Sequence, residues 1–454
     1  MITRRELLIG AAALAGCRGG PSLPAPNIII LAPDQLRGVA LSDAQVQTPH
    51  IDRLAAEGVT LRNCFANCPA SSPARASLLT GQYAHTHGVE VDDAPLSDGA
   101  VTLAEIFQEQ GYRTGFVGNW RLQGGVREPG FVPPGPRRQG FDFWAARITS
   151  HDYWRMRYYR DEPEPIEVSG YSAIAFTDEA IGFVAEQNDS PFLLFVEWGP
   201  PHDPYVAPPE YMNIYEPDGL AMRENWVDDV RDGLRNDVAG YYAAITFIDN
   251  EIGRLLEALA SSGKAENTIV LLTSDHGDML GSQGLSSKHK PWEESIRVPG
   301  ILRYPAGIEA RSGDDALFSH IDVAPTLLGL AGVPTPQTME GRDLSSLVLR
   351  PEHGGRSADE RAELQSPVYL QSCSATSPEH DAPWRGVRTE RYTYVRRAEA
   401  PWLLYDNQED PYQLNNLVGK PQHSETEAEL DRLTLERFEH TGDDWTERPE
   451  LPYR

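Results

Sequence analysis

The fold class that the sequence predicts is α/β: a large mixed, mostly parallel sheet flanked by helices, with a small C-terminal α+β subdomain. Three observations predict it. Short apolar runs typical of buried parallel strands alternate with helical patterns. Polar residues follow each run directly, as at the ligand-binding edge of an open sheet. After about residue 345 the composition becomes more polar, and the strand patterns there are those of an antiparallel sheet.

The strands of the main sheet are expected at residues 27–31, 114–117, 192–196 and 268–272. A helix is expected at 102–110, which Gly111 ends, and a longer one at 241–261, where isoleucine and leucine recur at helical spacing opposite charged residues. Because helices lie between successive strands, we expect them to cover both faces of the sheet. These elements assign residues 27–345 to one large domain.

Residues 346–454 are interpreted as a linker followed by a small antiparallel-sheet subdomain. Strands are expected at 368–370, 386–388 and 391–395, and a closing helix at 425–440. Ser424 and Glu427 have the spacing of a capping box at the start of that helix.

The N-terminal residues 1–17 predict a targeting signal, because Arg4-Arg5 precede an apolar run at 9–15 that is too short to span a membrane. The paired arginines resemble a twin-arginine export signal, and Leu14-Ala-Gly-Cys17 resembles a bacterial lipobox in which Cys17 carries the lipid. An ordinary signal peptide with a chance cysteine is the alternative. Residues 18–26 would then be a flexible tether of a periplasmic or cell-envelope lipoprotein, held to the membrane only through its lipid anchor.

The formal net charge is −27, from 67 acidic against 40 basic residues. Nucleic acid is excluded as a partner, because phosphate binding needs clustered lysine and arginine. After the signal the chain has three cysteines, Cys64, Cys68 and Cys373. Three thiols do not make a disulfide framework, and their spacing is not that of a zinc site. A Cys64–Cys68 or a Cys68–Cys373 bond is compatible with an oxidising compartment.

The polar segments that follow the four strands are far apart in the sequence: Asp34-Gln35, residues 119–121, His202-Asp203 and residues 275–278. In open α/β sheets ligands bind beyond the carboxyl ends of the strands. The sequence therefore predicts that these segments meet at one rim of the sheet.

Residues 71–81 read Ser-Ser-Pro-Ala-Arg-Ala-Ser-Leu-Leu-Thr-Gly. Pro73 suits the first turn of a helix that continues through Leu79. Ser71 would then face the positive end of that helix, with Arg75 one turn further on. The alternative is that Ser71 only caps the start of the helix.

This segment resembles the signature of the formylglycine-dependent (type I) sulfatases of the alkaline phosphatase superfamily: Cys or Ser, any residue, Pro, Ser or Ala, Arg, and later Thr-Gly. Only Ser71 has proline two and arginine four positions later, which Cys68 and Ser72 do not. The resemblance extends to residues 27–34, 48–58 and 404–417 in the family's order. It implies an alkaline-phosphatase-like fold, and it implies that a maturase oxidises Ser71 to formylglycine.

The resemblance also implies a calcium site formed by Asp34, Gln35, Ser71, Asp275 and His276. Calcium prefers several oxygen ligands, which the aspartates and the glutamine supply. His276 is a poor calcium ligand, so Mn²⁺ or another divalent ion is the alternative.

Further roles follow from the same family likeness. Lys288, in Lys-His-Lys-Pro-Trp, resembles the sulfate-binding lysine, and Lys290 has the wrong spacing for that motif. His202, in Gly-Pro-Pro-His, resembles a histidine that contacts the sulfate or leaving group and can protonate an alkoxide. His85 and His87 are expected either to line the pocket or to be structural.

One segment departs from the family. Where the family has Gly-Lys-Trp-His-Leu, this chain has Gly118-Asn119-Trp120-Arg121-Leu122. Asn119 carries no charge, and Arg121 cannot act as a base, but it can bind an anion with its fork of donors. We expect both to contact the substrate.

The function expected from these patterns is hydrolysis of a sulfate ester of a small molecule or glycan, with Ser71, Arg75, His202 and Lys288 as catalytic residues. Two alternatives remain. One is a phosphonate monoester or phosphodiester hydrolase on the same scaffold, and the other is a weakened relative that binds sulfated glycans.

Overall fold

The computed structural model describes residues 23–124, 130–148, 151–186, 190–227, 233–355, 366–372 and 383–445. The predicted export signal with Cys17, most of the 18–26 tether, and residues 356–365 of the predicted linker lie outside these ranges. No helix among the residues described is both long and apolar enough to cross a membrane.

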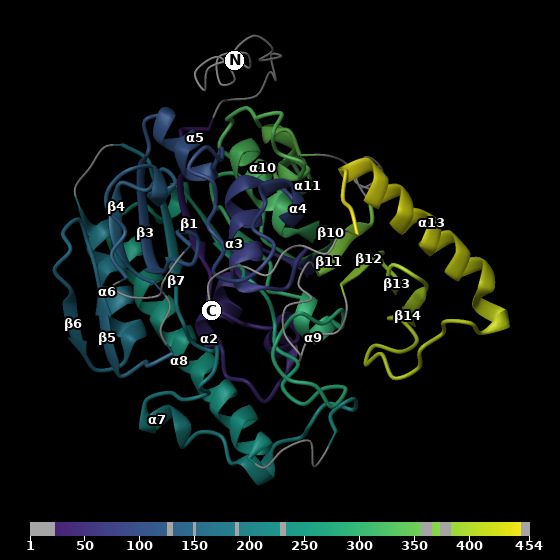
Figure 1. The fold of residues 1–454 in the computed structure, drawn as a ribbon. Coiled ribbons are helices and arrows are strands. Elements are labelled where there is room, and N and C mark those ends of the chain that lie inside the picture. Colours follow the sequence, from purple (N-terminus) through teal and green to yellow (C-terminus); the bar gives the residue numbers. More distant parts are fainter. Residues whose placement is uncertain are drawn as a thin grey trace.

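An eight-stranded sheet forms the centre of the larger domain, in the order β10-β2-β9-β8-β1-β7-β3-β4 (Figure 1). β9 is antiparallel to both of its neighbours, and the other neighbouring pairs are parallel. The predicted mixed, mostly parallel sheet is therefore confirmed. Its strands are β1 (Asn27–Leu31), β2 (Val59–Phe65), β3 (Arg113–Asn119), β4 (Phe143–Arg147), β7 (Phe192–Glu197), β8 (Thr268–Leu272), β9 (Ile301–Arg303) and β10 (Arg311–Ser319).

Helices cover both faces of this sheet because the central strands are apolar on both sides. In β1, Ile28 and Ile30 belong to one core cluster, and Ile29 and Leu31 belong to the other. The first cluster lies under α3 (Ser71–Thr80), α5 (Leu103–Glu109), α10 (His320–Leu330) and α11 (Ser345–Val348). The second lies under α2 (Pro49–Ala56), α6 (Ser172–Ala185) and α8 (Leu234–Ser261). Leu349 still packs in the first cluster, so the main core reaches just past residue 345.

Shorter elements complete the domain. A two-stranded sheet joins β5 (Arg155–Tyr158) and β6 (Ile166–Ser169), and single turns of helix form α4 (Ala84–His87), α7 (Pro209–Met212) and α9 (Glu293–Ile296). The 3-10 helices are Gly38–Ser42, Pro136–Arg138, Pro217–Gly219, Ala265–Asn267, Pro351–His353 and Pro421–His423.

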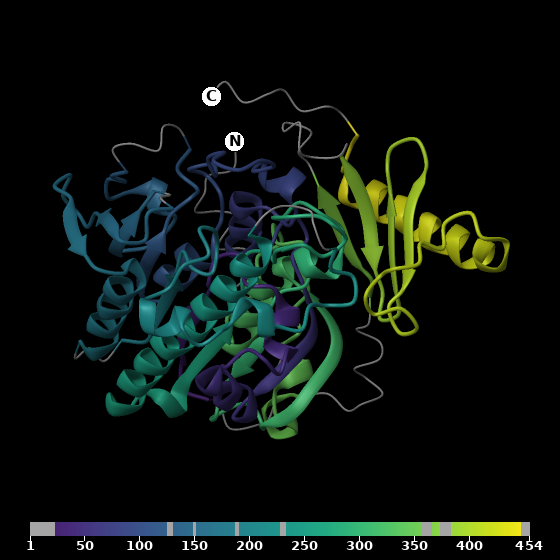
Figure 2. The ribbon, with the colours of Figure 1, turned by 90° about the horizontal axis from the view of Figure 1, so that it is seen from below.

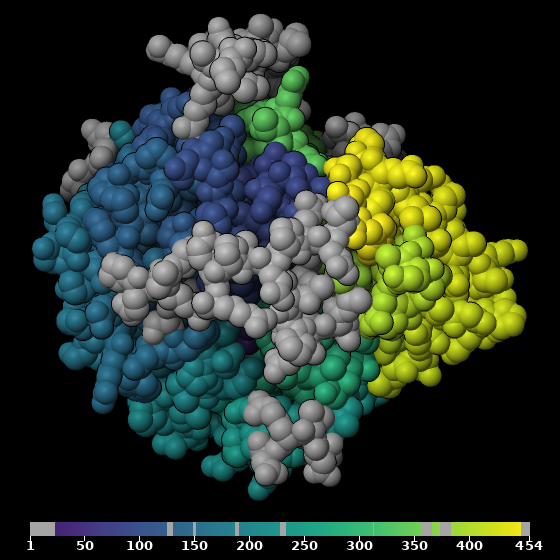
Figure 3. Space-filling view, viewed as in Figure 1, coloured from purple at the N-terminus to yellow at the C-terminus, as the bar shows by residue number. Residues whose placement is uncertain are grey.

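The C-terminal subdomain is a separate lobe beside the main domain (Figures 2 and 3). It is a four-stranded antiparallel sheet in sequential order, with one helix packed on it. Its elements are β11 (Val368–Ser372), β12 (Trp384–Arg388), β13 (Tyr392–Arg396), β14 (Pro401–Asp406) and α13 (Ser424–Thr441). The sequence predicted the first three strands and the helix but missed β14.

Two local expectations need correction. The predicted capping box at α13 is wrong, because the residue preceding the helix is His423 and the Ser424 hydroxyl bonds instead to the Pro421 carbonyl. The Glu427 carboxylate accepts from the Gly419 amide rather than from the helix start. Cys64 is a buried free thiol, so a Cys64–Cys68 bond is not formed, and Cys373 lies outside the described residues.

Candidate active site

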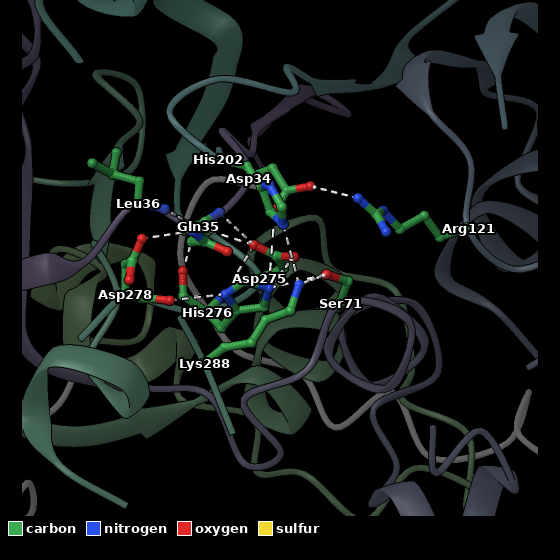
Figure 4. Close-up of polar contacts among 12 residues, drawn as sticks. Asp34, Gln35, Leu36, Ser71, Arg121, His202, Asp275, His276, Asp278 and Lys288 are labelled. Atoms are coloured by element: carbon green, nitrogen blue, oxygen red, sulfur yellow. Dashed lines mark hydrogen bonds and ion pairs between the residues drawn. The ribbon is translucent and has the colours of Figure 1, made fainter. Parts of the chain in front are cut away.

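The polar segments at the carboxyl ends of the central strands lie together in one buried cluster (Figure 4). Asp34 follows β1, Asn119 ends β3, Glu197 ends β7 and Asp275 follows β8. α3 brings Ser71 and Arg75 to the same place, and Lys288 comes from the loop between β8 and α9. Since neighbouring parallel strands end at the same rim, residues more than 200 positions apart become neighbours.

Ser71 is fully buried at the start of α3. The Lys288 ammonium donates to its hydroxyl oxygen over 2.6 Å, and His276 Nε2 lies 3.0 Å from the same oxygen. A lysine ammonium can only donate, so the serine oxygen accepts a hydrogen bond from Lys288 and its own hydroxyl donates one to His276 Nε2. A cation and the positive helix end thus face the oxygen of residue 71.

His276 turns an acceptor toward the centre of the cluster. Its Nδ1 lies 2.9 Å from the Gly277 carbonyl, which assigns the ring proton to Nδ1 and leaves a lone pair on Nε2. That Nε2 is 3.1 Å from Asp275 Oδ2 and 3.8 Å from Asp34 Oδ1. Three electron-rich atoms therefore converge, which is an arrangement that a cation stabilises.

Two orphaned acceptors support the same metal position. Asp34 Oδ1 and Gln35 Oε1 are buried and have no hydrogen-bond partner, a costly state unless a cation binds them. The Gln35 amide nitrogen donates to Asp278 Oδ2 over 2.6 Å, which leaves its oxygen for another contact. Asp34, Asp275 and His276 offer ligand atoms within 4.8 Å of one another. The residues present therefore fit a divalent ion with mostly oxygen ligands.

Arg75 binds three carboxylates. Its Nη1 donates to Asp275 over 2.7 Å, its Nη2 donates to Asp34 over 3.1 Å, and its Nε donates to Glu197 over 2.7 Å. Burial alone lowers the pKa of Arg75, but the three negative charges outweigh it and raise this pKa well above the ordinary value. Burial and the Asp275 charge raise the pKa of Asp34, yet Arg75, His202 and Arg121 bring it below its usual value. Arg75 thus holds the two metal-site aspartates in their ionised form.

Glu197 was missed by the sequence reasoning. Burial raises its pKa to about 7, against the opposing effect of Arg75. The available signal was a charged residue that ends the apolar run 192–196. The carboxylate orients the Arg75 guanidinium from the side that faces β7.

The two residues that differ from the family motif, Asn119 and Arg121, both make polar contacts in the structure. Arg121 Nη2 donates to Asp34 Oδ2 over 3.3 Å, so its guanidinium lies at the rim of the cluster (Figure 4). Asn119 accepts at Oδ1 from Arg147 Nε, which is 2.6 Å away. Arg147 is a buried residue that the sequence did not point to. Burial first, and Arg121 after it, lower the pKa of Arg147 to about 10, against the opposing effects of Tyr153 and Glu197.

His202 lies on the outer side of Lys288, with its Nε2 3.4 Å from the ammonium. Burial, and after it Lys288, lowers the pKa of His202 to about 4 against the opposing charge of Asp34. A second missed residue, Asp92, lies 4.0 Å from Lys288 and accepts from the Ser72 amide. Its pKa falls below the ordinary value because Lys288 and His289 outweigh its burial.

His85 and His87 are held by other partners. His85 Nδ1 lies 2.8 Å from Gln371 of β11, and its Nε2 lies 3.1 Å from the Thr441 carbonyl at the end of α13. His87 lies 3.1 Å from Ser77 within α3 and accepts from the Val89 amide. These contacts agree with the structural alternative for both residues rather than with a place in the pocket.

Comparisons with known proteins give consistent results. A family model described as Sulfatase matches residues 26–333, and one described as N-sulphoglucosamine sulphohydrolase, C-terminal, matches 281–440. The chain is 38% identical to an ulvan-active sulfatase of Formosa agariphila, over 93% of this chain and 83% of that protein.

Two solved structures are similar along nearly their whole length. A putative sulfatase from Bacteroides fragilis has a TM-score of 0.83 and 30% identity, over 95% of this chain and 99% of the other. A protein solved with its substrate D-glucosamine-2-N,6-O-disulfate has a TM-score of 0.83 and 25% identity, over 94% and 100%.

Proposed function

We propose, from the premise that this chain belongs to the sulfatase family, that it hydrolyses sulfate esters of a carbohydrate through a formylglycine made from Ser71. Its reaction class is hydrolysis of sulfuric esters, as its family and its relatives show. The substrate class, the modification and the residue roles below are the proposal.

The observation that carries the proposal is the position of Ser71. Its oxygen lies 2.6 Å from the Lys288 ammonium, at the positive end of α3 and beside the two aspartates that Arg75 binds. A plain structural cap would not need a buried lysine and a buried histidine on the same hydroxyl. A nucleophile that must be activated and oriented does need them.

The modification changes what residue 71 can do. Oxidation by a maturase removes two hydrogens from the Ser71 side chain and leaves an aldehyde, which water converts into two hydroxyl groups on one carbon. One oxygen attacks the sulfur and the ester oxygen leaves with the bonding electrons. The second hydroxyl then loses its proton, the aldehyde forms again, and sulfate departs.

The surrounding residues have separate tasks in this scheme. Lys288 places positive charge beside the attacking oxygen and the sulfuryl oxygens. Arg121 adds a second cation at the rim, and Asn119, fixed by Arg147, presents its amide to the substrate. His202 is the residue that delivers a proton to the leaving oxygen, since its Nε2 is within 3.4 Å of the Lys288 ammonium that can supply it.

Asp34, Gln35, Asp275 and His276 are the residues that would hold the divalent ion. Such an ion polarises the oxygens bound to it and lowers the pKa of a bound hydroxyl. The oxygen-rich donor set favours Ca²⁺, and His276 would also suit Mn²⁺.

The substrate is proposed to be a sulfated glycan. A relative is named for its action on ulvan, another is named N-acetylglucosamine-6-O-sulfatase, and a neighbour in structure was solved with a sulfated glucosamine.

We further propose that the protein is an exported lipoprotein anchored through Cys17, in the periplasm or cell envelope. Cys17→Ala should release it from the membrane fraction, and a variant that stays membrane-bound would contradict this anchor.

Mass spectrometry of the peptide around residue 71 tests the chemistry. Protein from a host that contains the maturase should show loss of two hydrogens at Ser71 and an unchanged Cys68 in the same peptide. An intact serine in that host would contradict the formylglycine step. Rates on an aryl sulfate and on the matched aryl phosphonate ester then compare the proposal with the alternative hydrolase. Activity on neither, with tight binding of sulfated glycans, would favour the binding-only alternative.

A further inference from the structure

A second group of metal-binding side chains lies beside the Ser71 cluster, on its outer side. His202 and Asp203 come from the turn after β7, and His151 comes from the segment between β4 and β5. One ring nitrogen of each histidine and one carboxylate oxygen of Asp203 lie within 4.8 Å of one another. The described residues contain two such groups, and the other is Asp34, Asp275 and His276 of the inner site.

The two imidazoles converge on one residue. His202 Nδ1 and His151 Nδ1 lie 2.9 and 3.0 Å from the Asp203 carbonyl oxygen, and His202 Nδ1 is also 3.1 Å from Asp203 Oδ1. The ring centroids are 4.7 Å apart, with a tilt of 38°. Nδ1 of each ring therefore faces the oxygen atoms of Asp203.

This group is partly open to solvent. The His202 side chain is 9% exposed, whereas the Asp203 side chain is 53% exposed. An ion can therefore enter past Asp203 without passing through the buried cluster around Ser71. The distance of 3.1 Å from Asp203 Oδ1 to His202 Nδ1 leaves room for an ion between them only after a small side-chain shift, because zinc requires ligand distances of about 2.0 to 2.2 Å.

The donor set differs from that of the inner site. Two imidazole nitrogens and one carboxylate are ligands that zinc and similar transition ions prefer, whereas the inner site is rich in oxygen. We propose that His151, His202 and Asp203 form a zinc site at the mouth of the active site, and that zinc bound there inhibits hydrolysis. The inhibition rests on the proposed function, while the binding does not.

The link between binding and inhibition is His202. The Lys288 ammonium can only donate, so His202 Nε2 accepts from it and the ring proton lies on Nδ1, toward the Asp203 carbonyl. A zinc ion on Nδ1 displaces this proton to Nε2, with no net proton released. Nε2 then presents an N–H to Lys288 instead of an acceptor. The ring can no longer take a proton from Lys288 and pass it to the leaving oxygen.

Zinc binding is tested first without any substrate. Competition with a chromophoric zinc indicator is measured on Asp275→Asn protein, in which the inner site is weakened. One ion per chain with micromolar or tighter affinity is expected. Adding His151→Asn should weaken binding at least 30-fold, and adding His423→Asn, a histidine outside the site, should leave it unchanged. Binding that is the same with and without His151→Asn would overturn the site.

Inhibition is tested second, on the otherwise wild-type enzyme with saturating Ca²⁺. His151→Asn and Asp203→Asn should each raise the zinc concentration for half inhibition at least tenfold, with activity in the absence of zinc within threefold of wild type. Equal inhibition of wild type and His151→Asn would place the inhibitory ion at the inner site and overturn the proposal. A failure of the zinc site and a failure of the proposed hydrolysis are distinguishable. If the protein hydrolyses no sulfate ester, zinc binding that is lost with His151→Asn still supports the zinc site.

Discussion

Asn119 and Arg147 are register partners at the carboxyl ends of the adjacent parallel strands β3 and β4, and the Arg147 Nε donates to Asn119 Oδ1 over 2.6 Å. The family motif that residues 118–122 resemble has a lysine at the position of Asn119. In this chain an amide stands at that position, and a buried cation, Arg147, lies beside it on the neighbouring strand. The departure from the family pattern is therefore accompanied by a matching residue, which sequence comparison of one motif does not show.

This pairing predicts a coupled pair of substitutions. Asn119→Lys alone places a second cation against the buried Arg147 and should lower the free energy of unfolding by about 2–4 kcal/mol. Adding Arg147→Gln should recover at least half of that loss, because the like charges are no longer adjacent. Urea unfolding of the two single variants and the double variant measures the coupling. Strictly additive effects would show that the two positions do not interact.

Lys288 predicts a loss of rate. Lys288→Met removes the cation 2.6 Å from the Ser71 oxygen and should lower kcat/KM about 10²- to 10³-fold, a magnitude typical of losing one charge-stabilising donor. Lys290→Met is the matched control, since it is a buried lysine two positions away whose spacing does not fit the motif. The control should stay within about threefold at an equal melting temperature. A Lys288 variant as active as the control would remove Lys288 from the mechanism.

The inner metal site predicts dependence on a divalent ion. A chelator should abolish activity, and Ca²⁺ should restore it and raise the melting temperature with increasing concentration, because the ion binds the folded state. Asp275→Asn should abolish both effects, since it removes a carboxylate that lies within 4.8 Å of the other two ligands. The exposed Asp218→Asn serves as the control. Full activity after exhaustive chelation would contradict the metal assignment.

His87 predicts a pH dependence of stability rather than of activity. Burial, and after it His85, lowers its pKa from 6.5 to about 3, and the Val89 amide donates to its Nδ1, where a second proton would have to sit. Because the pKa in the folded protein lies below the unfolded value, the unfolded state binds more protons. The stabilisation from neutral His87 is therefore present above pH 6.5 and is lost as the pH falls toward 3.

The measurement is the free energy of unfolding at pH 7 and at pH 4.5. The difference between the two should be smaller in His87→Gln than in the wild type, by about 2–3 kcal/mol. His423→Gln should leave the difference unchanged, and KM should stay the same in both variants. A large rise in KM for His87→Gln would contradict this prediction and indicate that His87 contacts the substrate.

The outline of the fold could be predicted because its signals are local. The strands at 27–31 and 268–272 are each apolar after their first residue, and the structure gives β1 and β8 the same bounds. The edge and antiparallel strands could not be predicted so easily. β9 has three residues, and β2 mixes buried with exposed positions, so neither has a clear period. The capping residues predicted for α13 failed because spacing alone does not fix where a helix begins.

The sequence by itself indicated the reaction class and predicted Ser71 as the nucleophile, since the register of Pro73 and Arg75 with Ser71 is a property of neighbouring residues. Only the tertiary structure decided which distant side chains act on one another. Glu197 on Arg75, Arg147 on Asn119, and His151 beside His202 are pairs joined by strand ends and loops that the chain order separates. Such contacts depend on which strands lie side by side, and that order is set by the packing of the whole sheet rather than by any single segment.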